Sequence, residues 1–420
     1  MSRFTQVTDS ECVDYFLPEP EFAAGTAIRQ EDSDKIPKIF KPLNLKKLSL
    51  HNRIGVSPMC MYSAGPNNEP TPFHLIHYGS ISMRGPGLTI VETASVSPEG
   101  RLSPQDLGIW TDDQAKKLKD IVEFAHAQKQ LMAIQIGHAG RKASGLAMYL
   151  HLEQIADKSI GGWPEDVVAP SAIQFRPNGN YMVPKELTKT EIKRIIKDFG
   201  LAAKRAVNIS GFDAIEIHGA HGYLISSFLS SVSNKRNDEY GGSFENRIRF
   251  LIEIIDEIKS QISADFPLLL RFNASENAED DPLSWKINDS IKLAKIVVSK
   301  GVDMLDISSG GNNYKQKSRG KIAFHATFAK EIKKAVGDTA LVACVGGLSH
   351  DLKSTSDMVE NGDFDFALIG REFLKNPGLI QSFADSLNVR VSFPLQYEWG
   401  FYPNKSSIIE LMEKSKCVTE

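Results

Sequence analysis

The segment Phe212-Asp-Ala-Ile-Glu-Ile-His218-Gly-Ala-His221-Gly-Tyr223 joins a mostly apolar run to a cluster of polar side chains. The run at 214–217 has the length and composition of a strand. Glycines after it permit a sharp turn, so that the two imidazoles and the phenol can face one pocket. A strand that carries such side chains at its carboxyl end is typical of an α/β barrel enzyme.

Three interpretations of this cluster remain open at this point. The histidines could be structurally satisfied residues of a turn. A metal site is disfavoured, because only two imidazoles are present and catalytic zinc needs three protein ligands. The third interpretation, which the other strand ends favour, has His218 and His221 polarising a substrate carbonyl and Tyr223 donating a proton.

Eight short apolar runs alternate with segments of helical periodicity along the chain, which predicts parallel strands closed into a (β/α)8 TIM barrel of the α/β class. A doubly wound sheet would usually have a glycine-rich turn after its first strand, where this chain has Ser57-Pro-Met-Cys60. The predicted strands span 53–56, 88–92, 131–136, 214–217, 268–272, 304–308, 340–345 and 366–369.

The chain is long enough for this barrel plus additions. Residues 1–37 are acidic and contain prolines, and we expect an extended or partly disordered arm. Residues 38–390 form the barrel as a single domain, with a predicted hairpin at 43–50 that plugs its amino-terminal end. A long excursion after the third strand, about 142–187, is expected to shape the substrate pocket. Residues 391–420 form a C-terminal tail.

Composition excludes several classes of protein. Of 420 residues, 41% are hydrophobic and 24% charged, and the formal net charge of −3 gives no reason to expect nucleic acid or an anionic membrane as a partner. No apolar run approaches transmembrane length, and the acidic N-terminus is unlike a targeting peptide. Four scattered cysteines form no disulfide framework, so we expect a cytoplasmic protein.

The last two strands end in glycines that suit a phosphate group. Gly346-Gly347 and Gly370-Arg371 follow the seventh and eighth predicted strands, which is the usual phosphate site of a barrel. Backbone N–H groups can approach an anion there, and Arg371 adds a forked donor. Arg271 places a second cation at the end of the fifth strand.

Other strand ends suggest contact with a planar cofactor. Gln135 could read the polar edge of a ring with one donor and one acceptor, or simply bond neighbouring backbone. Cys60 lies between two methionines and is followed by Tyr62. This setting suits contact with a polarisable aromatic group better than nucleophilic catalysis, because no base is tied to Cys60.

Together these residues resemble the Old Yellow Enzyme family of flavin-dependent ene-reductases, and most closely its thermophilic-like branch with a cysteine near the flavin. The resemblance spans Lys38 to about Asn388. Its motifs are Asn52-Arg-Ile, Ser57-Pro-Met-Cys-Met-Tyr62, His138-Ala-Gly-Arg-Lys142, Ala169-Pro-Ser171, His218-Gly-Ala-His-Gly-Tyr223, Asn237-Asp-Glu-Tyr-Gly-Gly-Ser243, Glu245-Asn-Arg247 and Ile369-Gly-Arg371.

The resemblance implies bound FMN, reduced by NADPH or NADH, that passes hydride to the β-carbon of an activated alkene. It implies a flavin site whose members act at the ring, at its polar edge, at its electron-rich end and at the phosphate. Ser57, Pro58, Met59 and Cys60 would lie beside the ring, and Thr93 and Gln135 would meet its polar edge. Arg271 would lie near its electron-rich end. Gly347, Gly370 and Arg371 would hold the phosphate.

The resemblance also assigns roles around the alkene. His218 and His221 would hydrogen-bond its carbonyl, with help from Tyr62, and Tyr223 would protonate the α-carbon. Cys60 would tune the flavin potential and substrate binding without a covalent step. No metal is implied.

Two positions depart from the family. Thr93 stands where a smaller residue is usual, and its hydroxyl could bond the flavin. Trp399 stands where an arginine usually reaches a neighbouring subunit, which leaves a possible homodimer open.

Three alternatives stay open from the residues alone. The same flavin barrel could be an NAD(P)H oxidase or quinone reductase. A phosphate-binding isomerase or aldolase would need a carboxylate base or a Schiff-base lysine at a strand end, whereas Lys142 is predicted in a loop. A flavin-binding sensor without turnover would not need the His218, His221 and Tyr223 set.

Overall fold

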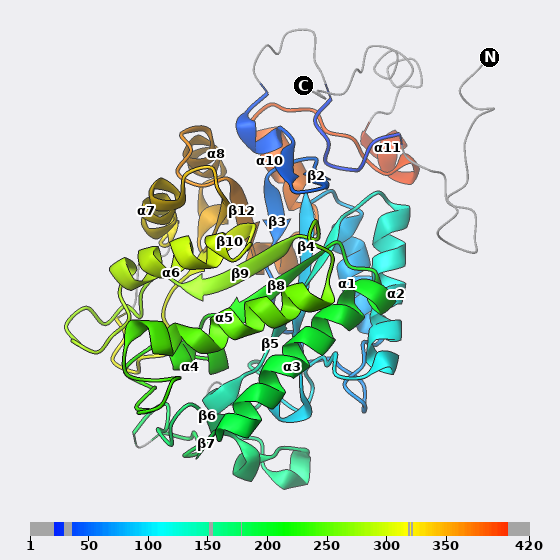
Figure 1. Cartoon of the computed structure of the whole chain (residues 1–420). Coiled ribbons are helices and arrows are strands. Elements are labelled where there is room, and N and C mark those ends of the chain that lie inside the picture. The colour runs from blue at the N-terminus through cyan, green and yellow to red at the C-terminus, as the bar shows by residue number, and fades with distance from the viewer. Residues whose placement is uncertain are drawn as a thin grey trace.

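The computed structural model describes residues 21–28, 36–150, 154–177, 179–317, 320 and 322–401. Within them a closed barrel of eight parallel strands forms the centre of the molecule (Figure 1). Its strands are β3 (Ile54–Val56), β4 (Leu88–Ser95), β5 (Met132–Gly137), β8 (Ala214–Gly219), β9 (Leu268–Asn273), β10 (Met304–Ser308), β11 (Leu341–Val345) and β12 (Phe366–Ile369). The predicted TIM barrel is confirmed, and each predicted strand overlaps one of these eight.

Helices surround the barrel and connect successive strands (Figure 1). The longer ones are α1 (Pro72–Ser82), α2 (Asp112–Ala127), α3 (Lys189–Arg205), α5 (Phe244–Gln261), α6 (Ile287–Ser299), α7 (Ala326–Val336), α8 (Leu352–Glu360) and α10 (Leu379–Ser386). Shorter helices are α4 (Leu224–Leu229), α9 (Arg371–Lys375) and α11 (Leu395–Phe401).

Threonine caps two of these helices. Thr188 caps α3, because its side chain accepts a hydrogen bond from the Glu191 N–H. The cap of α2 is neither Asp112 nor Asp113, although aspartate also favours this position. Thr111 is the cap, and the two aspartates lie in the first turn, where they favour the positive end of the helix dipole.

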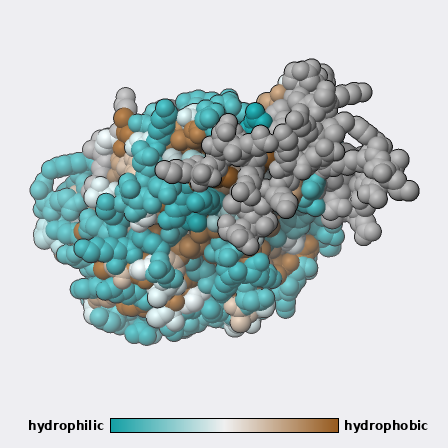
Figure 2. Space-filling view, turned by 90° about the horizontal axis from the view of Figure 1, so that it is seen from above, coloured by the Kyte–Doolittle hydropathy of each residue, from teal (hydrophilic) through white to brown (hydrophobic). Residues whose placement is uncertain are grey.

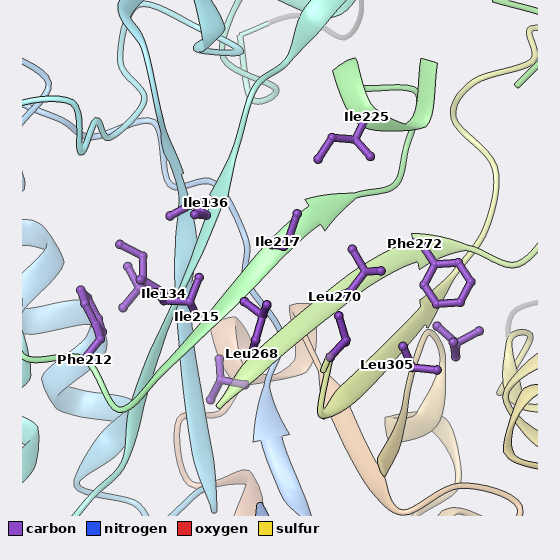
Figure 3. Packing of buried hydrophobic residues seen from close by; sticks show 14 of the residues in the cluster. Ile134, Ile136, Phe212, Ile215, Ile217, Ile225, Leu268, Leu270, Phe272 and Leu305 are labelled. Carbon is purple, nitrogen blue, oxygen red and sulfur yellow. The ribbon is translucent and has the colours of Figure 1, made fainter. Parts of the chain in front are cut away.

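Alternation along the strands divides the core into two layers. Side chains such as Ile134, Ile215 and Leu270 point outward and pack with the helices (Figure 3). The residues between them point into the barrel. At its amino-terminal end the interior is apolar, and Leu45 and Leu50 of the predicted hairpin, now β1 (Leu43–Leu45) and β2 (Leu48–Leu50), pack into it.

Two residues further along these strands, on the same inward face, the barrel interior becomes polar. Glu216 and Gln135 follow Ala214 and Ala133 on the inward face, while Arg271 and Asp306 follow Leu269 and Met304. These four side chains are all buried: Gln135, Glu216, Arg271 and Asp306. They form the floor beneath the carboxyl ends of the strands.

The excursion after β5 lies at that carboxyl end, the lower end in Figure 1. Between 142 and 187 it contains short turns and a two-stranded parallel sheet of β6 (Val168–Ala169) and β7 (Lys185–Glu186). It therefore lies where the predicted substrate-shaping segment should lie.

Part of the N-terminal arm packs on the barrel. The Gly25 and Ile28 N–H groups donate to Ser392 and Arg390 carbonyls at 2.9 Å, and Ala27 is buried. Residues 21–28 are thus tied to the start of the C-terminal tail rather than only wrapped on the surface. The rest of the arm, 1–20 and 29–35, the tail beyond 401 and the Trp399 side chain lie outside the described residues.

The coloured part of the surface in Figure 2 is mostly hydrophilic, with scattered apolar residues. Among the described residues, none of the helices has the length and apolar character needed to cross a bilayer. The described residues also contain no cluster of three or more potential metal ligands from histidine, cysteine and carboxylates.

Candidate active site

A cavity of about 980 Å³ opens at the carboxyl ends of the strands. This volume is within the usual range for a ligand or cofactor site. It brings together six of the predicted site residues from the ends of five strands: Met59, His221, Arg271, Gly347, Gly370 and Arg371. Ser57 joins them through a 2.8 Å hydrogen bond from Arg271 Nη2.

One end of the cavity is built for an anion. Gly346 and Gly347 have φ of 104° and 73°, the left-handed region that favours glycine. A Cβ at Gly346 would also lie 2.7 Å from the ring of Phe324. Arg371 lines this end, and no hydrogen bond or ion pair joins its side chain to another described residue. Its guanidinium is therefore available to a ligand.

Charge along the lining also fits a phosphate. Cationic side chains predominate among the described lining residues, where Glu372 is the acidic one and pairs with Lys375 at 3.1 Å. The cations are Arg176, Arg271, Lys317, Arg371 and Lys375. The sulfur of Met59 and the side chains of Leu348 and Ile369 supply an apolar wall. A planar ring with a phosphate tail, as in FMN, fits these features.

Hydrogen bonds fix the polar side chains that are predicted to meet the edge and the electron-rich end of the flavin ring. Thr93 donates its hydroxyl to Gln135 Oε1, and Gln135 Nε2 donates to Glu216 Oε2 at 2.6 Å. The Thr93 hydroxyl is thus engaged with Gln135 in this structure. Arg271 donates through Nε to Asp306. Gln135 and Arg271 are therefore held in fixed orientations by buried carboxyl groups.

The two predicted histidines lie next to each other. His218 Nε2 is 3.3 Å from His221 Nδ1, and the ring centroids are 5.0 Å apart. His221 has a left-handed backbone (φ 61°), which is stabilised by a hydrogen bond from its N–H to Asn273 Oδ1 and by Lys142 Nζ on its carbonyl at 2.9 Å. Lys142, which was considered above as a Schiff-base lysine, instead stabilises this turn.

A backbone donor fixes the tautomer of His218, whereas the tautomer of His221 follows the Ser308 hydroxyl. The Ala220 N–H donates to His218 Nδ1 at 3.2 Å, so the proton of neutral His218 is on Nε2. The Ser308 hydroxyl lies 2.7 Å from His221 Nε2. When that hydroxyl donates, His221 carries its proton on Nδ1. In this tautomer His218 Nε2–H and His221 Nδ1–H are both donors, and an acceptor oxygen bound between them replaces the hydrogen bond that otherwise joins the two nitrogens at 3.3 Å.

Both imidazoles are neutral at ordinary pH. Burial, followed by the charge of Arg271, lowers the pKa of His218 to about 3. Burial and then His218 and Arg271 lower the pKa of His221 well below its usual value. Neutral imidazoles donate one hydrogen bond each, which is what a carbonyl acceptor requires.

His218 also lines a small second pocket. It is lined by four more of the predicted residues, Cys60, Thr93, His218 and Tyr223, and by the buried Asp106. Tyr223 stacks edge-on to His218 at a centroid distance of 4.9 Å. Burial raises the pKa of Tyr223, so its phenol keeps its proton. It can therefore serve as a proton donor.

Cys60 and Tyr62 lie beside Tyr223. Burial raises the pKa of the Cys60 thiol well above its usual value, which argues against a thiolate nucleophile. Burial also raises the pKa of Tyr62, and Cys60 and Tyr223 add to this effect because they are close to it. Tyr62 is buried with a φ of 53°, and its ring packs edge-on against Tyr149. Pro58 is buried between Ser57 and Met59.

Three residues of the site were missed in the sequence. Ser308 touches His221, whereas Glu216 and Asp306 orient Gln135 and Arg271. Each of the two carboxyl groups interrupts an otherwise apolar strand at an inward position. A single carboxyl group within a buried apolar strand is a signal that could have identified them.

Comparison with known proteins agrees with this geometry. The NADH:flavin oxidoreductase / NADH oxidase family matches residues 38–389. An NADH:flavin oxidoreductase of Gibberella zeae is 43% identical over 401 residues, which cover 93% of this chain and 95% of that protein. NADPH dehydrogenase of Bacillus subtilis is 40% identical over 365 residues, covering 87% and 99%.

Solved structures show the same fold. Morphinone reductase is 27% identical, with a TM-score of 0.68, and the match covers 87% of this chain and 93% of that one. The isomerase and aldolase alternatives therefore have no support. The chain belongs to the NADH:flavin oxidoreductase / NADH oxidase family, the Old Yellow Enzyme family, and is an FMN-dependent oxidoreductase with NAD(P)H as its electron donor.

Proposed function

We propose that this protein is an ene-reductase that reduces the carbon–carbon double bond of an α,β-unsaturated carbonyl or nitro compound. The observation that carries the proposal is the pair of ring nitrogens, His218 Nε2 and His221 Nδ1, 3.3 Å apart and beside the protonated Tyr223. The two imidazoles can both donate to one carbonyl oxygen, and Tyr223 can protonate a neighbouring carbon. This arrangement suits an enone better than a quinone, because reduction of a quinone needs no protonation of carbon.

Each side chain has a defined task in this proposal. Bound FMN would supply the hydride chemistry, from NAD(P)H to the β-carbon of the alkene, and the side chains bind and orient the substrate and move its proton. His218 and His221 donate hydrogen bonds to the substrate oxygen, where negative charge develops. Tyr223 gives its phenolic proton to the α-carbon. Tyr62 adds a contact to the carbonyl.

The thermophilic-like branch is part of the proposal. Cys60 lies in the pocket with Tyr223, and its protonated thiol is suited to tuning the flavin and the substrate contact without forming a bond. Ser57, Pro58 and Met59 precede it along the ring, and Gly347, Gly370 and Arg371 would hold the phosphate. Activated alkenes would be the small-molecule partners.

A labelling experiment tests the reaction. The enzyme is given nicotinamide coenzyme carrying deuterium at the reactive C4 position, with cyclohexenone in ordinary water. We expect one deuterium at the β-carbon of the product and a solvent-derived hydrogen at the α-carbon. Oxidation of the coenzyme without deuterated ketone, but with reduction of oxygen or quinone, would instead identify an NAD(P)H oxidase or quinone reductase.

Ser308→Ala should weaken enone binding through His221. Without the hydroxyl, His221 Nε2 loses its donor and the ring can adopt the tautomer that has no Nδ1–H. We expect the KM for cyclohexenone to rise about 3- to 10-fold, the effect of one neutral hydrogen bond, with little change in flavin reduction by NADPH. Ser309→Ala, next in sequence but bonded to His325, is the control. An unchanged KM would contradict the tautomer argument.

Reduction of the enone should not depend on pH between about 5 and 8, even though two histidines bind it. The lowered pKa of His218, about 3, keeps this imidazole neutral as the pH falls through that range. The raised pKa of Tyr223 keeps its proton as the pH rises. The check is single-turnover reoxidation of the reduced enzyme at each pH. An acid limb near the ordinary histidine pKa would show that an imidazole gains its proton in this range.

A further inference from the structure

A continuous chain of buried polar side chains crosses the barrel interior beneath the site. It begins at the predicted flavin contacts Thr93 and Gln135 and ends at two others, Arg271 and Ser57. The links between them are the carboxyl groups of Glu216 and Asp306, both fully buried. This layer exists because inward positions on neighbouring strands are in register: Gln135 pairs with Glu216, and Arg271 with Asp306.

The two carboxyl groups contact each other directly. One oxygen of each is engaged, Glu216 Oε2 by Gln135 and Asp306 Oδ2 by Arg271. The remaining oxygens, Glu216 Oε1 and Asp306 Oδ1, are buried and have no hydrogen-bond donor among the described residues. Two adjacent buried carboxylates repel each other when both are charged, and a proton on one of them removes this repulsion and supplies a donor for the other.

We propose that Glu216 and Asp306 share one proton and act as a positioning pair that couples the protonation of the barrel floor to the reduction of the flavin. This proposal rests on the flavin contacts assigned above to Gln135 and Arg271. With the proton in place, the pair carries one negative charge, which Arg271 balances. Without it, the layer carries a net negative charge beneath the cofactor.

The charged and titratable groups around the pair support a proton that is held near neutral pH. Arg271 faces both carboxyl groups from β9, His218 lies above on β8 as a neutral ring, and Cys344 on β11 is a protonated thiol near Asp306. Burial raises the pKa of Glu216 to about 8, opposed by Arg271 and reinforced by Asp306. Burial likewise raises the pKa of Asp306.

The sign of the coupling follows from charge. Loss of the shared proton leaves an extra negative charge near the ring, which disfavours adding electrons to it. Conversely, the negative charge of the reduced flavin raises the proton affinity of the Glu216–Asp306 pair. Above about pH 8 reduction should therefore take up one additional proton at the pair. Uptake of one additional proton changes the equilibrium constant of reduction tenfold per pH unit, which for a two-electron couple is about 30 mV.

The test is the flavin midpoint potential of the FMN-loaded protein between pH 6 and 10, without any alkene. We expect a wild-type curve that becomes steeper by about 30 mV per pH unit above about pH 8. Glu216→Gln keeps the hydrogen bonds to Gln135 and Asp306 but has no proton to lose. Its curve should match the wild type below this pH and lack the additional slope above it. Asp306→Asn should lose the additional slope as well.

Glu276→Gln is the matched control, because Glu276 is also a buried carboxyl but bonds Asn312 and Ser284 instead of the floor. It should retain the additional slope. Parallel curves for the wild type and Glu216→Gln across the whole range would overturn the proposal. This outcome is separate from a failure of alkene reduction, since no alkene is present.

Infrared spectroscopy gives a second readout that does not depend on flavin loading. The wild type should show a protonated carboxylic acid band at neutral pH that shifts in D₂O. The difference spectrum against Glu216→Gln should contain this band, and raising the pH above about 9 should remove it. Absence of the band at neutral pH would also overturn the shared proton.

Discussion

Tyr223→Phe is expected to slow the reoxidation of the reduced enzyme by cyclohexenone by about 10²- to 10⁴-fold, the usual contribution of a general acid. The variant removes the phenolic proton and leaves the ring that packs against His218. Protonation of the α-carbon would then depend on water, which the buried pocket restricts. Reduction of the flavin by NADPH needs no proton from Tyr223 and should change less than threefold.

The measurement is stopped-flow absorbance of the flavin in the two half-reactions separately. Tyr240→Phe is the control. Tyr240 is a buried tyrosine whose hydroxyl donates to Glu253 at 2.8 Å on the outside of the barrel. It should leave both half-reactions unchanged. Equal slowing of both half-reactions in Tyr223→Phe would remove its role as proton donor and indicate a general disturbance of the site.

Arg271→Met is expected to destabilise the protein by about 3–5 kcal/mol and to abolish stable FMN binding. Arg271 is the cation that balances the buried Glu216 and Asp306 pair, and removal of one partner leaves an uncompensated buried charge. The thermal midpoint of unfolding and the ratio of flavin to protein measure the two effects. Arg271→Lys retains the charge and should lose much less stability.

A double variant separates charge from packing. Arg271→Met together with Asp306→Asn removes the unbalanced charge and should recover most of the lost stability, but not the flavin contact. If Arg271→Met were as stable as the wild type and kept its FMN, the electrostatic role assigned to the barrel floor would be wrong.

Much of the fold could be predicted because buried parallel strands give short apolar runs at regular spacing. The run ending at His218 is an example, and its glycines placed the turn correctly. The first residue of α2 is harder to predict, because Thr111, Asp112 and Asp113 are all of a type that favours the cap position. Local polar residues of similar capping propensity cannot be ranked without the geometry of the turn.

Local sequence identifies the residues at each strand end, but it does not identify the contacts between residues of different strands. In the sequence Ser308 is an ordinary residue at the end of a strand. Its contact with His221, 87 residues away, depends on the tertiary fold. Glu216 and Asp306 belong to different strands of the same inward layer, so their contact depends on barrel register. The folding of 21–28 against 390–392 depends equally on a long-range contact that no local pattern encodes.

The most direct test of the central claim is an anaerobic titration of the purified protein in two steps. NADPH is added first, and the visible flavin band is followed until it bleaches. Cyclohexenone is then added without oxygen. We predict full recovery of the band and one saturated ketone formed per flavin. Bleaching that no enone reverses, but that air or a quinone does, would contradict the claim that this flavin barrel is an ene-reductase.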